Sequence, residues 1–134
     1  MIKKLHHIGV AVKSLEEATQ LYRVLGLEAS PEEEVAEQKV KLTMIGVGES
    51  RVELLESTDP EGPVGRFLAG KGEGIHHLAL EVEDIEQALS QLKEAGLRLI
   101  DQTPRPGAHG TRVAFVHPKS AQGVLLELVE KGQE

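Results

Sequence analysis

The sequence predicts an α+β fold built from two copies of one module. Residues 5–12 read LHHIGVAV and residues 75–82 read IHHLALEV. Each stretch opens an alternating apolar strand with a histidine pair, and His7 and His77 occupy matching positions. Two copies favour a pseudo-twofold pair of sheets, because a solenoid needs about three or more repeats.

A helix is predicted after the first strand of each copy. Ser14-Leu-Glu-Glu17 and Asp84-Ile-Glu-Gln87 have the pattern of a capping box at a helix N-terminus. Apolar residues at helical spacing follow both boxes. Gly26 and Gly96 then stand where a helix C-terminus often needs a left-handed residue.

The rest of the first module is expected to contain further strands. Alternating residues predict strands at 40–47 and 51–55, whereas the acidic run 31–37 is expected to be a solvated loop. Residues 57–74 are rich in turn residues and are interpreted as a linker between the modules. One helical turn is expected in this linker, at 64–68.

The second module is expected to repeat this plan. A strand is predicted to begin at 97–100, and a loop rich in proline and glycine at 104–110 leads to a strand at 111–116. The final strand is expected at 124–129. The 134 residues then form one domain, 1–134, with modules at about 1–56 and 75–130 and the linker at 57–74.

Composition excludes several classes of function. The net charge of −7 argues against nucleic-acid binding, which relies on a basic surface. The absence of cysteine excludes disulfides, thiolate metal sites and cysteine nucleophiles. The N-terminus lacks the pattern of a signal peptide, and no apolar segment approaches 18 residues. We therefore expect a cytoplasmic protein that does not enter a membrane.

Four side chains at repeated positions are the candidate functional residues. Each module carries a histidine followed two positions later by a small residue, and a glutamate between apolar residues near its end. These residues are His7, Glu53, His77 and Glu127. Any one of them alone is more often a packed or exposed side chain than a ligand. Because the pattern recurs, we expect all four to converge and bind one divalent first-row metal ion.

The other histidines are expected to lie outside this site. His6 and His76 also repeat, but strand alternation directs them to the opposite face, where a structural role is expected. His109 and His117 have no partner in the repeat and fall in or beside loops. A ligand role is not expected for either of them.

Several segments together resemble a known family. Residues 5–12, 52–56 (VELLE) and 74–82 (GIHHLALEV) have the patterns of the vicinal oxygen chelate superfamily, and residues 107–128 (GAHGTRVAFVHPKSAQGVLLEL) resemble the signature of its methylmalonyl-CoA epimerase family. The resemblance covers nearly the whole chain. It implies two tandem βαβββ modules that form a cupped, mostly antiparallel eight-stranded sheet around one metal site.

The resemblance also implies an isomerase reaction. Members of the epimerase family interconvert the 2R and 2S epimers of methylmalonyl-CoA, in propionate metabolism, through a metal-stabilised enolate. Here His7 and His77 match the histidine ligands, Glu127 matches a glutamate that is both ligand and acid/base, and Glu53 falls where some members have glutamine. The expected metal is Co²⁺, with Mn²⁺, Ni²⁺ or Zn²⁺ as alternatives. The expected partners are an acyl-CoA substrate and a second copy of the chain in a homodimer.

The sequence departs from the family at one position of the proposed mechanism. Some members carry a second acid/base glutamate on the strand after the acidic loop, where residues 38–44 read QKVKLTM and contain no carboxylate. Glu37 and Gln38 are the nearest candidates. Arg112, Lys119 and Lys39 are candidates for holding the anionic substrate, although exposed solubilising charges are an equally good interpretation.

The sequence is also compatible with two other functions. Glyoxalase I uses the same set of ligands, although the segment 117–128 favours the epimerase. A binding protein without catalysis, such as a member that sequesters an antibiotic, is the third hypothesis, and such members generally lack the metal ligands.

Overall fold

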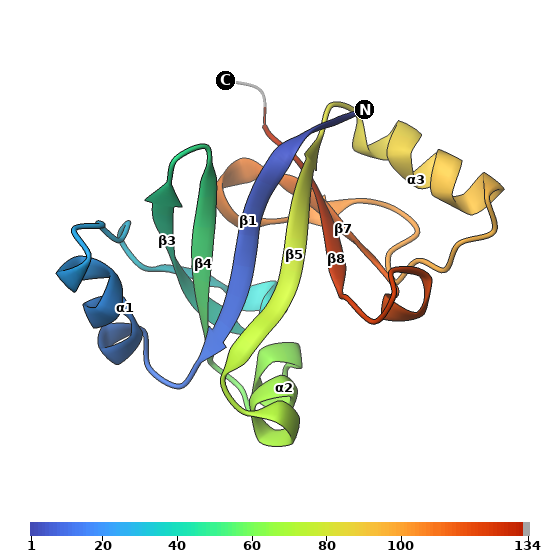
Figure 1. Cartoon of the computed structure of the whole chain (residues 1–134). Helices are drawn as coiled ribbons and strands as arrows, with labels where there is room; N and C mark the ends of the chain where they lie inside the picture. Colours follow the sequence, from blue (N-terminus) through green and yellow to red (C-terminus); the bar gives the residue numbers. More distant parts are fainter. Residues whose placement is uncertain (133–134) are drawn as a thin grey trace. The chain divides into compact units, whose positions relative to one another are not determined.

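Both halves of the chain fold as the βαβββ module, and the class is α+β, as predicted (Figure 1). The computed structural model describes residues 1–132. It contains two compact units, one formed by His7–His76 and the other by Met1–His6 together with the chain from His77 onward. The division falls inside both histidine pairs, between His6 and His7 and between His76 and His77.

The first module contains four strands and one helix, with a second helix after it. The elements are β1 (Ile2–Val12), α1 (Leu15–Val24), β2 (Glu33–Val35), the 3₁₀ turn η1 (Ala36–Gln38), β3 (Val40–Val47), β4 (Ser50–Ser57) and α2 (Pro63–Lys71). The strand order is β2-β3-β4-β1, in which β1 runs parallel to β4 and the other neighbours are antiparallel.

The second module repeats this topology. Its elements are β5 (Gly74–Val82), α3 (Ile85–Glu94), β6 (Arg105–Pro106), the 3₁₀ turn η2 (Ala108–Gly110), β7 (Arg112–Val116), the 3₁₀ turn η3 (Pro118–Ser120) and β8 (Leu126–Glu130). The order is β5-β8-β7-β6, with β5 parallel to β8 and the other neighbours antiparallel. Each module therefore joins its first and last strands in parallel.

Three segments differ from the expectation. The acidic run contains the short strand β2, which pairs with β3 at the edge of the sheet. Residues 97–100 do not form a regular strand. They make only one isolated bridge, between Leu99 and Val116, and a few backbone hydrogen bonds to β7 and to the residue after it. The helical turn expected in the linker is the nine-residue helix α2.

The helix of each module packs on one face of its sheet and forms the core there. In the first module the buried residues Val12, Leu15, Ile45 and Leu54 form this cluster. In the second module the equivalent cluster includes Val82, Ile85, Leu89, Ala114 and Leu128. Alternation along the strands leaves the opposite face of each sheet for the polar residues described below.

The N-termini of α1 and α3 are held in two ways. The predicted caps form, because Ser14 Oγ accepts a hydrogen bond from the N–H of Glu17 and Asp84 Oδ1 accepts one from the N–H of Gln87. In addition, Glu56 Oε1 accepts the N–H of Leu15 at 2.9 Å. The carboxylate of Glu56 thus ties the last strand of the module to the start of its helix.

The second module uses the same arrangement. Glu130 Oε2 accepts the N–H of Ile85 at 2.9 Å. The other oxygen of each carboxylate side chain pairs with a cation of the neighbouring antiparallel strand, Lys41 at 3.2 Å from Glu56 and Arg112 at 2.8 Å from Glu130. A negative charge at a helix N-terminus is favourable because the helix dipole is positive there.

Replacing Glu56 with alanine should lower the free energy of unfolding by about 1–2 kcal/mol. The change removes a charge-assisted hydrogen bond and leaves the N–H of Leu15 without its carboxylate. Urea unfolding followed by circular dichroism measures the effect. Glu49→Ala, at an exposed position between β3 and β4, is the control and should change stability by less than about 0.5 kcal/mol. Equal stabilities for the two variants would contradict the structural role of Glu56.

The first six residues belong to the second unit by their contacts as well. Lys3 Nζ lies 3.5 Å from Glu81 Oε2, and the N–H of Glu83 donates to the carbonyl of Met1 at 3.1 Å.

Within residues 1–132, no helix is both long and apolar enough to cross a lipid bilayer.

Candidate functional site

The first histidine–glutamate pair lies on the sheet face opposite α1. His7 Nε2 is 3.4 Å from Glu53 Oε1, and both side chains are more than 90% buried. Glu53 lies directly opposite Gly9 across the parallel pairing of β1 and β4. Because strand residues two apart share a face, His7, Gly9 and Glu53 point to the same side. The residue beside the imidazole is thus a glycine, which has no side chain.

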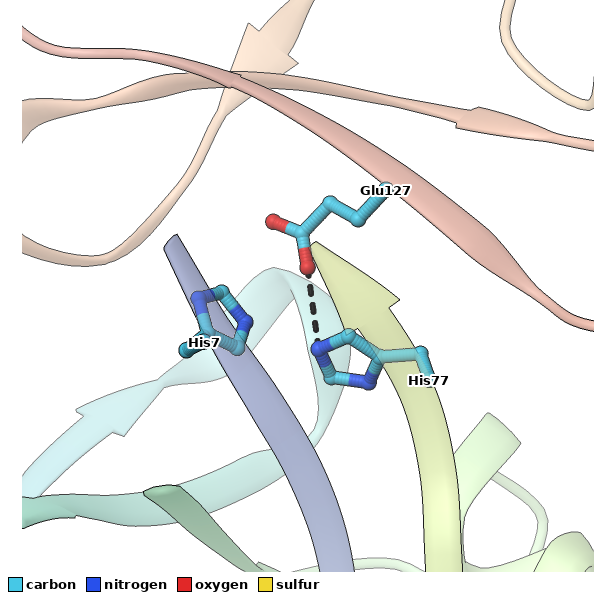
Figure 2. Close-up of side chains that lie close together, drawn as sticks. All are labelled: His7, His77 and Glu127. Carbon is cyan, nitrogen blue, oxygen red and sulfur yellow. Dashed lines mark ion pairs between the residues drawn. The ribbon is translucent and has the colours of Figure 1, made fainter. Parts of the chain in front are cut away.

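The second pair has the same construction. His77 Nε2 is 3.0 Å from Glu127 Oε1, the ion pair drawn as a dashed line in Figure 2. Both side chains are again more than 90% buried. Glu127 lies opposite Ala79 across the parallel pairing of β5 and β8. Ala79 therefore takes the position that Gly9 has in the first module, and the small residue is again beside the histidine.

The two pairs are equivalent in register as well as in residue type. In both modules the residue two positions after the histidine is the direct partner of the glutamate. On the other side, Glu53 pairs with Met44 of β3, and Glu127 pairs with Phe115 of β7. The sequence repeat thus corresponds to a repeat in three dimensions within the separate modules.

These side chains have the chemistry of a metal site. His7, His77 and Glu127 are buried and each offers an atom that a metal ion can take as a ligand. Glu53 adds a second carboxylate beside His7. Neutral imidazole nitrogens and carboxylate oxygens are common ligands of divalent first-row ions, and a buried histidine–carboxylate pair already places such ligands close together.

Phe115 positions His77 from the side. The two rings meet edge to face, with centroids 5.9 Å apart and an interplanar angle of 84°. The guanidinium of Arg105 lies over the same phenyl ring, 5.3 Å from its centroid, and pairs with Asp101 at 3.4 Å. Sequence analysis did not single out Phe115 or Arg105, since neither has an identical counterpart in the repeat.

The remaining histidines have varied surroundings. His6 is buried and His76 stacks edge to face on Phe67 at 5.0 Å. His109 is exposed and adopts a left-handed backbone conformation in η2. Nδ1 of His117 accepts the N–H of Lys119, so this histidine caps η3. None of these four histidines is among the metal ligands proposed below.

The candidate substrate-binding cations have different environments. Arg112 binds Glu130 through two hydrogen bonds, of 3.1 and 2.8 Å. The hydrogen bonding to that carboxylate, and then its charge, raise the pKa of Arg112. Lys119 is exposed in η3. Lys39 pairs with Asp59 at 3.4 Å. A role in binding substrate stays a prediction for all three.

Sequence analysis missed the helix-anchoring glutamates, although a signal for them exists. Both modules carry a glutamate three residues after the site glutamate, in Glu53-Leu-Leu-Glu56 and Glu127-Leu-Val-Glu130. The first glutamate of each pair lies on the site face and the second reaches the helix N-terminus. The last strand of each module therefore fixes the site and the helix together.

The whole chain is similar to proteins of known activity. The family model described as the glyoxalase/bleomycin resistance protein/dioxygenase superfamily matches residues 6–115. The mitochondrial methylmalonyl-CoA epimerase of Dictyostelium discoideum is 41% identical over 132 residues, which cover 97% of this chain and 80% of the relative. The ethylmalonyl-CoA/methylmalonyl-CoA epimerase of Cereibacter sphaeroides is 40% identical over 131 residues, covering 96% and 98%.

A solved structure gives the same result for the fold. A methylmalonyl-CoA epimerase in complex with methylmalonyl-CoA and NH₄⁺ matches with a TM-score of 0.94 at 35% identity. The match covers 98% of this chain and 96% of that one. These relatives are isomerases, and both modules of the present chain take part in the similarity.

Proposed function

Since the chain belongs to the glyoxalase/bleomycin resistance protein/dioxygenase superfamily, we propose that it interconverts the 2R and 2S epimers of methylmalonyl-CoA. The observation that carries this proposal is the buried histidine–glutamate pair, repeated in the same register in both modules. The relatives named above support the choice of reaction and substrate.

The proposal includes one divalent metal ion held by both pairs. His7, Glu53, His77 and Glu127 would be its four protein ligands. The support for this ligand set is that His7, His77 and Glu127 are buried and each offer a ligand atom, and that Glu53 lies beside His7. The buried imidazoles and carboxylates fit such an ion, and Co²⁺ is the metal we propose, with Mn²⁺, Ni²⁺ or Zn²⁺ as alternatives.

The reaction requires a proton to leave the carbon between a carboxylate and a thioester. A divalent ion at this site would supply Lewis acidity to the substrate oxygens, which lowers the cost of the negative charge that develops there. Gly9 and Ala79 are small and leave room for the substrate beside the histidines. The four charged or polar side chains are buried, which would keep bulk water away from a substrate bound beside them.

Glu127 is the proposed acid/base on one side of the substrate. One of its carboxylate oxygens is held by His77 Nε2 at 3.0 Å, which fixes the direction of the side chain. The carboxylate would accept the α-proton and later return one. Glu53 is a second candidate for proton transfer, in addition to its role as a ligand.

The remaining parts of the proposal concern substrate binding and assembly. Lys119 and Arg112 are candidates for contact with the anionic parts of the acyl-CoA. Lys119 is exposed, whereas Arg112 already binds Glu130. A homodimer, a cytoplasmic location and a single domain spanning 1–134 stay predictions.

The test is exchange of the α-proton with solvent. The protein is loaded in turn with Co²⁺, Mn²⁺ or Ni²⁺ and incubated with methylmalonyl-CoA of one configuration in D₂O. We expect deuterium at the α-carbon, measured by NMR and mass spectrometry, together with appearance of the other epimer.

Two outcomes would contradict the proposal. The absence of exchange with every metal would refute the epimerase reaction. Turnover of the hemithioacetal of methylglyoxal and glutathione, without exchange of methylmalonyl-CoA, would assign the site to glyoxalase chemistry instead.

A further inference from the structure

We propose that Glu33 of β2 is the second acid/base, which exchanges a proton with the substrate carbon on the side opposite Glu127. This inference rests on the proposed epimerase reaction. Inversion at a carbon needs one group that removes a proton from one face and another that delivers a proton to the opposite face. The strand β3 reads VKLTMIGV and carries no carboxylate for this purpose.

The strand register places Glu33 on the same face as the proposed metal ligands of its module. Glu33 pairs directly with Leu42 across β2 and β3, and Met44, two residues after Leu42, pairs with Glu53. Directly paired residues of antiparallel strands share a face, as do residues two apart on one strand. Glu33 and Glu53 therefore project from the same side of this sheet, the side of His7.

The neighbouring carboxylates point elsewhere. Glu34 pairs with Lys41, which lies on the other face beside Glu56. The pKa of Lys41 is raised, first by its hydrogen bond to Glu56 and the charge of Glu56, and further by the charges of Glu32 and Glu34. Both of these glutamates therefore act on the face away from His7.

Glu37, the carboxylate nearest to β3 in sequence, lies outside β2. It is exposed in the 3₁₀ turn η1, between the two strands. Among the four glutamates of the acidic run, Glu33 is the one that the strand register directs to the site face.

The surroundings of Glu33 suit a group that handles a proton away from bulk water. The side chain is half-buried, and its Oε2 atom is buried. Its direct partner, Leu42, is 2% exposed. A carboxylate oxygen that is shielded from solvent suits an acid/base group, because bulk water then does not compete for the transferred proton.

The proton transfer balances with two carboxyl groups. In one direction the carboxylate of Glu127 takes the α-proton, so that a C–H bond breaks, an O–H bond forms and the electron pair passes into the enolate. The carboxyl of Glu33 then gives its proton to the other face of the carbon, where the electron pair forms the new C–H bond. The reverse reaction uses the two groups in exchanged roles, and the solvent restores their protonation states.

The test compares the two epimers separately in Glu33→Gln. The wild-type protein should exchange the α-proton of both epimers with D₂O and interconvert them. In the variant, interconversion should fall by about 10²–10⁴-fold, the usual contribution of one general acid/base. One epimer, whose proton faces Glu127, should still incorporate deuterium with retention of configuration. Metal content, measured by elemental analysis, should equal that of the wild-type protein.

The matched control is Glu34→Gln, which changes the adjacent glutamate on the other face and should keep exchange and interconversion of both epimers. Interconversion by Glu33→Gln within about threefold of the wild-type rate would overturn the inference. So would loss of exchange from both epimers, with or without loss of metal. One-sided exchange in Glu37→Gln, with normal turnover by Glu33→Gln, would assign the role to Glu37.

The result also separates this inference from the proposed function. If the wild-type protein interconverts the epimers and Glu33→Gln does too, the epimerase reaction stands and the role of Glu33 is refuted. If the wild-type protein exchanges neither epimer with any metal, both proposals fail.

Discussion

Glu127→Gln should lower kcat/KM for methylmalonyl-CoA by about 10³–10⁴-fold. This loss lies in the upper part of the range for removing a general acid/base, because Glu127 is also a proposed metal ligand and holds His77 at 3.0 Å. Glutamine has nearly the same shape but takes no proton at neutral pH. Steady-state epimerisation and α-deuterium exchange measure the effect in the metal-loaded protein.

Glu53→Gln is the companion variant. The two glutamates have equivalent positions in the two modules, and both are more than 90% buried. The amide oxygen of glutamine still offers a ligand atom, so a much smaller loss than in Glu127→Gln would limit Glu53 to metal binding. Equal losses would place both carboxylates in proton transfer, and full activity of Glu127→Gln would remove that residue from the mechanism.

His77→Ala should lower the affinity for the metal ion by more than about 100-fold, the upper limit seen when a residue that merely supports a ligand is removed. The imidazole of His77 is buried, faces Glu127 and is held edge-on by Phe115. Isothermal titration with Co²⁺ of protein first treated with a chelator measures the affinity. Wild-type protein in metal at 1,000 times the dissociation constant should gain about 4 kcal/mol of stability, since the ion binds the folded state.

The adjacent histidine provides the control for this variant. His76 belongs to the same strand but contacts Phe67, at 5.0 Å between ring centroids. His76→Ala should therefore bind Co²⁺ with nearly wild-type affinity, whatever its effect on stability. Loss of metal from His76→Ala and retention by His77→Ala would reverse the assignment of the two histidines.

The candidate ligands could be predicted from sequence because the duplication supplies its own comparison. One histidine at the start of a strand has many ordinary explanations, but His7 and His77 recur with small residues after them. Glu53 and Glu127 recur in the same way. The structure pairs each glutamate with the residue two positions after its histidine, so the repeated pattern corresponds to a repeated register.

The strand β2 could not be predicted in the same way. Its residues, Glu33–Val35, show no apolar alternation, and the strand exists because its backbone pairs with β3. The register of that pairing decides which of three consecutive glutamates shares a face with Glu53. Composition alone predicts a solvated loop for this run, because the strand depends on backbone pairing with the neighbouring strand β3 rather than on a side-chain pattern of its own.

The roles of Glu56 and Glu130 escaped prediction for a related reason. Local sequence predicts helix caps such as Ser14 and Asp84, which act within three residues. Glu56 reaches the N–H of Leu15, and Glu130 reaches that of Ile85, across 41 and 45 residues of chain. Such contacts depend on the tertiary fold.

The assignment of Met1–His6 to the second unit affects how the protein forms during synthesis. Met1–His6 leave the ribosome before their partners Glu81 and Glu83, which follow some 80 positions later. Pairings between such distant segments form slowly because a long loop must close first. The N-terminal end of β1 therefore cannot form these contacts until residues 81–83 have been made. A ribosome-bound fragment that ends in the linker would leave this end of the strand exposed.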